Sequence, residues 1–257
     1  MTIKSQSPVV LTIAGSDSGG GAGVQADLKT FASMDVFGVS AITAITAQNP
    51  RRIKSIFPLS TKTIREQVRT VCEYFNVAAV KTGMLYNEQI VFAVAEEIRL
   101  SKIPIVVVDP ICKATSGKTL LTVKAFHALC TELLPLATLI TPNVPEAEMF
   151  LKCRIKTHAG QCAAAANLST KFRTACVVKG GHMPGNEIID VLCHEGKIFK
   201  FKSRRIDVKT HGTGCVYSAA LAACLARGMN LRNACAEATK HVYRSVLQKQ
   251  ASREIPS

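Results

Sequence analysis

The sequence predicts an α/β protein in which a central, mostly parallel β-sheet is flanked by helices on both faces. Short apolar segments alternate with longer helical segments along almost the whole chain, which is the pattern of a parallel sheet with crossover helices. Segments such as 106–108 are apolar at every position, as strands are when both faces of the sheet are covered. No repeat, low-complexity tract or linker interrupts the 257 residues, so we expect one domain over residues 1–257.

The expected elements follow one another in a regular order. We expect strands over residues 9–14, 40–47, 53–57, 77–81, 105–109, 138–141, 175–179, 188–193 and 198–202. We expect helices over residues 24–34, 61–74, 87–100, 123–134, 145–151, 160–171, 214–227 and 231–249. Thr63 and Glu66 have the spacing of a capping box at the start of the second helix. Glu195-Gly196 is expected to turn the last two strands into a hairpin.

The composition is that of a globular chain, with 47% hydrophobic and 19% charged residues. No apolar leader precedes the first strand, and the apolar run at 105–108 is far shorter than a membrane span. The ten cysteines are spread along the chain without a C-x-x-C pair, which argues against a zinc site or a disulfide framework. We therefore expect a soluble, cytoplasmic protein with reduced cysteines and no membrane partner.

The formal charge of +14 favours either a polyanionic ligand or a general bias toward basic residues. The densest basic cluster, at 197–209, alternates with Ile198, Phe199 and Phe201, as the solvated face of a strand pair does. The chain has no tryptophan and no motif of stacking aromatic residues, so we do not expect it to bind nucleic acid.

Two glycine-containing segments follow expected strands. Residues 15–23 hold five glycines in nine positions, which allows backbone to approach a ligand closely but also suits a tight turn. The spacing is not that of a dinucleotide-binding fingerprint. Ser116-Gly117-Lys118-Thr119 looks like the end of a phosphate-binding P-loop, but Cys112 stands where the first glycine is required. We do not interpret that segment as a P-loop.

Asn143 and Glu146 begin a helix directly after a strand. An Asn-x-x-Glu pair at this place can orient magnesium-bound water, and the helix dipole favours a carboxylate there. The alternative is a helix with an Asn N-cap and a proline in its first turn.

Residues 210–215 carry the strongest chemical signal, because Gly212-Thr213-Gly214 precedes a helix of small residues. Such a start turns successive backbone N–H groups toward one point, which suits the charge on a transferring phosphoryl group. Cys215 follows on the first helical turn, where the dipole favours a thiolate and should lower the pKa of the thiol. The alternative is a glycine turn before a packed helix.

Taken together, these segments resemble the hydroxymethylpyrimidine/phosphomethylpyrimidine kinases of thiamine synthesis. Seven segments are similar and occur in the family's order: Ala14–Phe31, Ile42–Asn49, Lys81–Leu85, Val108–Pro110, Ile140–Ala147, Val178–His182 and His211–Cys215. The resemblance implies a ribokinase-like three-layer fold and a homodimer. It also implies that the γ-phosphoryl group of ATP is transferred to the hydroxymethyl of 4-amino-5-hydroxymethyl-2-methylpyrimidine, and then to the monophosphate.

The resemblance also implies a role for each matching residue. Gln48 and Asp27 would hold the pyrimidine, in a pocket lined by Gly15 and Met84. Asp109 and Glu146 would hold Mg²⁺. The ATP would contact Lys179, Asn143 and Thr213. The turn Gly212-Thr213-Gly214-Cys215 would form the anion hole, with Cys215 as the general base.

The chain departs from the family pattern at Cys112 and Lys113, where apolar residues are usual, and at Lys118, where Asp is common. It also lacks the aromatic and histidine-containing tail of many relatives. The first rival interpretation is a pyridoxal kinase, an activity that recurs on nearly the same fold. The second is a non-catalytic sensor with this fold.

Overall fold

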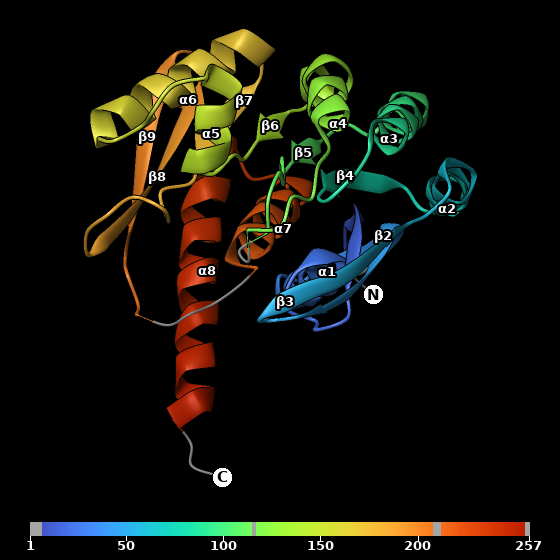
Figure 1. Cartoon of the computed structure of the whole chain (residues 1–257), viewed down its shortest axis with the longest axis horizontal. Coiled ribbons are helices and arrows are strands. Elements are labelled where there is room, and N and C mark those ends of the chain that lie inside the picture. Colours follow the sequence, from blue (N-terminus) through green and yellow to red (C-terminus); the bar gives the residue numbers. More distant parts are fainter. Residues whose placement is uncertain (1–6, 115–116, 208–211, 255–257) are drawn as a thin grey trace, which may run out of the picture.

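The computed structural model describes residues 7–114, 117–207 and 212–254. One nine-stranded sheet runs through the molecule in the order β3-β2-β1-β4-β5-β6-β7-β8-β9 (Figure 1). The strands are β1 (Val9–Asp17), β2 (Phe37–Asn49), β3 (Arg52–Pro58), β4 (Val77–Thr82), β5 (Val106–Val108), β6 (Leu139–Ile140), β7 (Ala175–Val178), β8 (Glu187–His194) and β9 (Lys197–Arg204). The six strands from β2 to β7 in sheet order are parallel, while β3, β8 and β9 pair antiparallel. The predicted fold class is confirmed.

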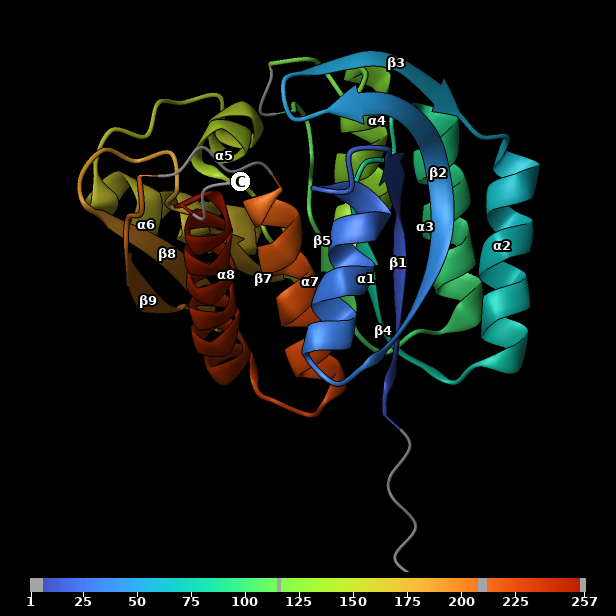
Figure 2. The ribbon, with the colours of Figure 1, turned by 90° about the horizontal axis from the view of Figure 1, so that it is seen from below.

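Helices cover both faces of this sheet, as Figure 2 shows. On one face lie α1 (Gly23–Ser33), α7 (Thr213–Ala226) and α8 (Leu231–Glu254). On the other face lie α2 (Thr61–Tyr74), α3 (Glu88–Ser101), α4 (Val123–Ala128), α5 (Val144–Leu151) and α6 (His158–Phe172).

Each face of the sheet has its own apolar core. Val106 and Val108 of β5 belong to the core beneath α2 to α6, whereas Val107 belongs to the core beneath α1, α7 and α8. This division follows from the alternation of side chains along a strand. It explains why the central strands are apolar at every position, as the sequence indicated.

Most element boundaries differ from the expectation by a few residues, and two differences have a clear cause. The helix expected over 123–134 ends as α4 at Ala128, and a π-turn (Leu129–Leu133) and a 3₁₀-turn (Leu134–Leu136) follow. Pro135 lies in that 3₁₀-turn, where its ring and missing N–H end regular helix. The capping box expected from Thr63 and Glu66 was wrong. Ser60 caps α2 instead, and its side chain accepts a hydrogen bond from the Thr63 N–H at 3.1 Å.

The single-domain expectation over 1–257 stays a prediction, since the described residues do not cover the whole chain. Within them, no helix is long and apolar enough to cross a membrane.

Two neighbouring glycines after β7 differ in the space around them, because the backbone at one of them packs tightly on β8. A Cβ placed on Gly180 would overlap the backbone carbonyl oxygen of Ile189, whereas one on Gly181 would have no heavy atom within 4 Å. Because a backbone group cannot move aside as a flexible side chain can, Gly180→Ala should lower the free energy of unfolding by about 2 kcal/mol or more. Gly181→Ala, the matched control, should change it by less than about 0.5 kcal/mol. Urea unfolding of the two variants measures this, and equal stabilities would contradict the packing described.

Candidate active site

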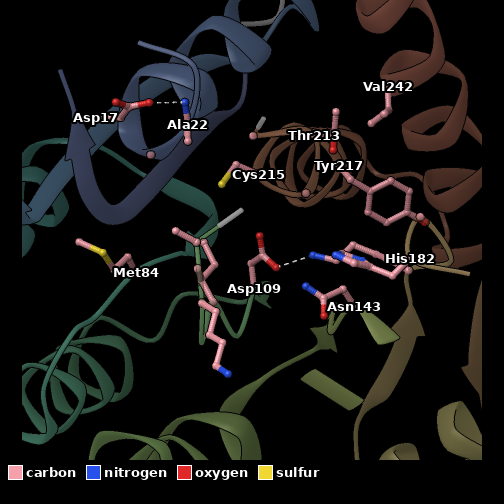
Figure 3. A pocket seen from close by; sticks show the side chains of 18 of the residues that line it. Asp17, Ala22, Met84, Asp109, Asn143, His182, Thr213, Cys215, Tyr217 and Val242 are labelled. Atoms are coloured by element: carbon pink, nitrogen blue, oxygen red, sulfur yellow. Dashed lines mark hydrogen bonds and ion pairs between the residues drawn. The ribbon is translucent and has the colours of Figure 1, made fainter. Parts of the chain in front are cut away.

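A cavity of about 480 Å³ opens at the carboxyl ends of the parallel strands, where ligands bind in open α/β sheets. Its size is that of a site for a small molecule. Figure 3 shows Met84 at one side, Tyr217, His182 and Val242 at the other, and Asp109 and Cys215 between them. The cavity therefore has two halves, which we call the Met84 half and the His182 half.

The glycine-rich segment after β1 is folded around one carboxylate. Asp17 accepts hydrogen bonds from the N–H groups of Gly19 at 2.8 Å, Gly21 at 3.0 Å and Ala22 at 2.8 Å. A Cβ on Gly23 would overlap the carbonyl oxygen of Gly15. The glycines are thus needed for close backbone packing at the start of α1. Sequence reasoning did not identify Asp17 as the residue that organises this loop.

The start of α7 lies against that loop. Gly212 is the N-cap with a φ of 80°, and a Cβ there would overlap the carbonyl oxygen of Gly21. The first-turn N–H groups of α7 have no partner within their own helix, and Gly212, Thr213, Gly214 and Cys215 all line the cavity. The expected anion-binding turn is therefore formed by residues that the structure describes, while Thr210 and His211 lie outside the described residues.

The protonation of Cys215 differs from the sequence-based expectation. Its side chain is buried, and burial raises the pKa of the thiol to about 11, although the Lys81 ammonium acts to lower it. The expected depression of the pKa by the helix start was therefore wrong. Desolvation outweighs the helix dipole and the nearby cation. In the unliganded protein Cys215 is a neutral thiol at neutral pH.

Asp109 links three elements at the centre of the cavity. Its Oδ1 atom lies 2.7 Å from the Lys179 ammonium and accepts a hydrogen bond from Thr141 at 3.3 Å. Its Oδ2 atom accepts a hydrogen bond from the Ser218 hydroxyl of α7 at 3.0 Å. Lys179 also lies close to the α7 turn, since a Cβ on Gly214 would sit 3.2 Å from its ammonium. The expected neighbours Asp109, Lys179 and Gly214 are indeed brought together.

Asn143 and Glu146 form a complete capping box at the start of α5. The Asn143 side chain accepts from the Glu146 N–H at 2.9 Å, and the Glu146 carboxylate accepts from the Asn143 N–H at 2.8 Å. Both residues also line the cavity, so the cap and a role in the site are compatible. Burial, with a smaller contribution from Asp109, raises the pKa of Glu146 to about 7.

The pair Asp109 and Glu146 fits a divalent cation by its chemistry. Both carboxylates are nearly buried and line one cavity, and a cation between them would offset both the burial of the Glu146 carboxylate and its smaller repulsion by Asp109. Mg²⁺ commonly uses only one or two carboxylates together with water and substrate phosphates. Among the described residues no group of three or more His, Cys, Asp or Glu side chains could hold a metal on its own.

The residues expected around the pyrimidine do not all reach the cavity. Gly15, Gln48 and Met84 line it, and a Cβ on Gly15 would be only 2.5 Å from the Met84 methyl carbon. Asp27 does not line it. Asp27 is fully buried and binds the Lys81 ammonium at 2.8 and 3.0 Å and the Thr12 hydroxyl at 2.6 Å. Its position is that of a residue beneath the site, because a carboxylate with these partners has no free oxygen directed at a ligand.

Residues 112–114 pair antiparallel with residues 118–120 over the Met84 half. Leu120 donates its N–H to the Cys112 carbonyl at 2.9 Å, and the Lys118 ammonium donates to the Ile53 carbonyl at 3.1 Å. Lys113 lines the cavity, and Ser116 lies outside the described residues. Lys118 is thus tied to strand β3, and the interpretation that this segment is not a P-loop agrees with its antiparallel pairing.

The His182 half contains residues that sequence reasoning missed. Asp190 of β8 is buried. Its carboxylate accepts hydrogen bonds from the Gly180 N–H at 2.9 Å and from the Thr239 hydroxyl of α8 at 3.4 Å. Arg205 holds the loop before β8 by donating to the carbonyls of Gly181 at 3.0 Å and Met183 at 2.6 Å. The sequence signal that could have identified Asp190 is a charged residue inside an apolar strand. The same signal is present at Lys81.

Comparisons with known proteins agree with this geometry. The model of the family described as phosphomethylpyrimidine kinase matches residues 17–254. A hydroxymethylpyrimidine/phosphomethylpyrimidine kinase of Bacillus subtilis is 42% identical over 92% of this chain and 88% of its own. One from Haemophilus influenzae is 45% identical over 88% of this chain and 86% of its own.

Solved structures of two related kinases also match. A phosphomethylpyrimidine kinase of Clostridium difficile has a TM-score of 0.83 at 33% identity, covering 93% of this chain and 99% of its own. The pyridoxal kinase of Bacillus subtilis in complex with ADP has a TM-score of 0.84 at 38% identity, covering 91% of this chain and 90% of its own.

The buried carboxyl of Asp190 predicts a pH-dependent stability. Burial raises the pKa of Asp190 to about 6, so the folded protein binds its proton more tightly than the unfolded chain does. Stability therefore falls as the pH rises from about 4 to 6, and above that range the ionised form costs up to about 3 kcal/mol. Asp190→Asn should raise the free energy of unfolding at pH 8, relative to the native chain, and should lose most of that advantage at pH 4.5. Urea unfolding at both pH values tests this. An advantage that is independent of pH would mean that repacking, and not ionisation, is responsible.

Proposed function

The chain belongs to the phosphomethylpyrimidine kinase family, and we propose that it transfers the γ-phosphoryl group of ATP to 4-amino-5-hydroxymethyl-2-methylpyrimidine and then to its monophosphate. The observation that carries this proposal is the arrangement of one continuous cavity. Gln48 and Met84 line one half, and Asp109, Lys179 and the turn at Gly212 lie between it and the other half. An acceptor and a nucleotide can thus meet end to end, as in-line phosphoryl transfer requires.

The Met84 half is the proposed acceptor site. Its wall combines apolar groups, such as Met84 and Leu120, with the amide of Gln48. An amide both donates and accepts hydrogen bonds, so it suits the edge of an aminopyrimidine. Gly15 leaves room for the Met84 side chain at the bottom of this half.

The His182 half and the α7 turn are the proposed ATP site. Lys179 stands next to Gly214 and would place its ammonium near the phosphates, while the N–H groups of Gly212, Thr213 and Gly214 would face the transferring group. Asn143 would support this site from the start of α5. Asp109 and Glu146 would hold Mg²⁺, which neutralises phosphate charge during transfer.

Cys215 is the proposed general base. A neutral thiol cannot accept a proton, so the pKa of about 11 must fall in the loaded enzyme. Asp109 is one of the groups that raise it, and a cation bound by Asp109 would remove that contribution. We therefore propose that a cation at Asp109 favours ionisation of the thiol, while burial still opposes it.

Pyridoxal kinase is the second candidate function. Its support is the structural match to the pyridoxal kinase of Bacillus subtilis at 38% identity. The pyrimidine kinases reach 42% and 45%, so the pyrimidine is the preferred acceptor in our proposal.

We also propose a homodimer in the cytoplasm. Ile45 of β2 and Phe57 of the edge strand β3 are large apolar residues that remain exposed, and they are direct partners across the two strands. An apolar patch beside a sheet edge is suited to burial against a second copy.

A substrate panel tests the function. With ATP and Mg²⁺, the hydroxymethylpyrimidine and its monophosphate should be phosphorylated with kcat/KM at least about tenfold above that for pyridoxal, because Gln48 is matched to the aminopyrimidine edge. Gln48→Leu should lower kcat/KM for the pyrimidine by about tenfold or more and leave the KM for ATP unchanged. Preference for pyridoxal would reverse the assignment, and equal losses for both acceptors would make Gln48 a structural residue.

The base is tested by replacing Cys215. Cys215→Ala should reduce kcat roughly 100-fold without changing the KM for ATP, because the acceptor proton loses its receiver. Cys215→Asp should recover part of the rate, since a carboxylate can take the same proton. Cys224→Ala is the matched control, because this cysteine is buried on the same helix but does not line the cavity. If Cys215→Ala is as fast as Cys224→Ala, transfer proceeds without a thiol base.

A further inference from the structure

Lys81 is the one lysine that is completely buried among the described residues. It lies next to the last residue of strand β4, and its ammonium binds both carboxylate oxygens of Asp27, at 2.8 and 3.0 Å. Thr12 of β1 donates to the same carboxylate at 2.6 Å. A Cβ on Gly83 would be 3.1 Å from the ammonium nitrogen, so the glycine after β4 leaves room for it.

This ion pair lies where α7, the helix that carries Cys215, packs against β4 and α1. Lys81 and Cys215 line the same cavity, and the N–H of Gly23 donates to the Cys215 sulfur. Gly23 begins α1, and Asp27 lies one turn later on that helix. The Asp27 carboxylate therefore fixes the Lys81 ammonium under the junction of α1 and α7.

Fold stability alone does not account for such a pair. Moving two charges out of water costs several kcal/mol per ion, and a well-packed apolar pair of similar volume is often as stable or more so. The ammonium has three donor hydrogens, and among the hydrogen bonds of the described residues it donates only to Asp27. The Lys81 ammonium lies at the wall of the cavity with a donor hydrogen to spare, so it can act on groups inside the cavity.

Four charged groups from the surrounding elements face the thiol. Lys81 of β4 and Lys179 after β7 favour its anion, whereas Asp27 of α1 and Asp109 after β5 oppose it. Lys179 is already paired with Asp109 at 2.7 Å. The equilibrium between thiol and thiolate at Cys215 therefore depends on Lys81 and on its counter-ion, Asp27.

We propose that Lys81 is a positioning residue whose buried ammonium, fixed by Asp27, stabilises the thiolate form of Cys215. Asp27 acts on this reaction through Lys81 and not by touching the pyrimidine. The catalytic consequence rests on the proposed function, whereas the effect on the thiol does not. Removing the ammonium leaves Asp27 and Asp109 opposite the sulfur, and removing the Asp27 charge leaves the ammonium unopposed.

Alkylation of Cys215 in the full chain, without ligands, tests the proposal. The rate constant for iodoacetamide at pH 8.5 is proportional to the thiolate fraction, and mass spectrometry of the peptide containing Cys215 separates it from the other cysteines. Lys81→Met should lower this rate constant about tenfold or more, and Asp27→Asn should raise it about tenfold. The double variant should lie between the two. Lys171→Met is the matched control, because its ammonium donates to the Phe150 carbonyl away from the cavity, and it should leave the rate unchanged.

The opposite signs separate electrostatics from loosening of the structure. If either replacement merely opened the fold, both single variants would alkylate faster, and that result would overturn the proposal. An unchanged rate in Lys81→Met would overturn it as well. Should Lys81→Met fail to fold, Asp27→Asn and the double variant decide, since the proposal requires the double variant to alkylate more slowly than Asp27→Asn.

Kinase assays of the same variants keep the two proposals distinct. If alkylation changes as expected and kcat for the pyrimidine falls in Lys81→Met with the KM for ATP unchanged, the positioning role extends to catalysis. If alkylation changes as expected but no form of the chain phosphorylates the pyrimidine, the proposed function fails while the effect of Lys81 on Cys215 stands.

Discussion

The contact between two glycine-rich turns is the constraint on which the site depends. Gly212 of the α7 turn lies against the backbone of Gly21, and Gly23 lies against the backbone of Gly15. A side chain at Gly212 would push the start of α7 away from the loop before α1, and one at Gly23 would push α1 away from β1. Because the two helix starts meet, the N–H groups of one turn and the sulfur on the other share a single small space. Glycines at 15 and 23 are therefore explained by packing as much as by access for a ligand.

Around this contact, the carboxylates near the centre of the site are held by hydrogen bonds or ion pairs. Asp17 holds the first turn, Asp109 joins Lys179 to Ser218, and Glu146 closes the cap of α5. These bonds fix the side chains before any ligand arrives, so little ordering is left for binding to accomplish. Preorganisation of this kind is what electrostatic catalysis of phosphoryl transfer needs.

The sequence allowed the sheet, the layers and most of the site to be predicted, because those features depend on local patterns and on a family resemblance. The alternation of apolar strand segments with helical segments indicated a mostly parallel sheet. The strand ends indicated where Gln48, Asp109 and Cys215 converge. The predicted cap of α2 was wrong for a local reason, because the N-cap lies three residues before Thr63. Two other predictions failed for one common reason. The state of the Cys215 thiol and the position of Asp27 depend on burial, and no spacing in the chain encodes how deeply a group is buried. Lys81 and Asp190 were missed likewise, although each is a charged residue within an apolar strand.

The burial of Cys215 has a consequence for the resting enzyme. Peroxides and other electrophiles react with thiolates far faster than with thiols, so a cysteine that is neutral and shielded is chemically quiet. The proposed base is therefore shielded while no ligand is bound. A slow reaction of Cys215 with oxidants is the expected consequence of the same desolvation that raises the pKa of the thiol to about 11.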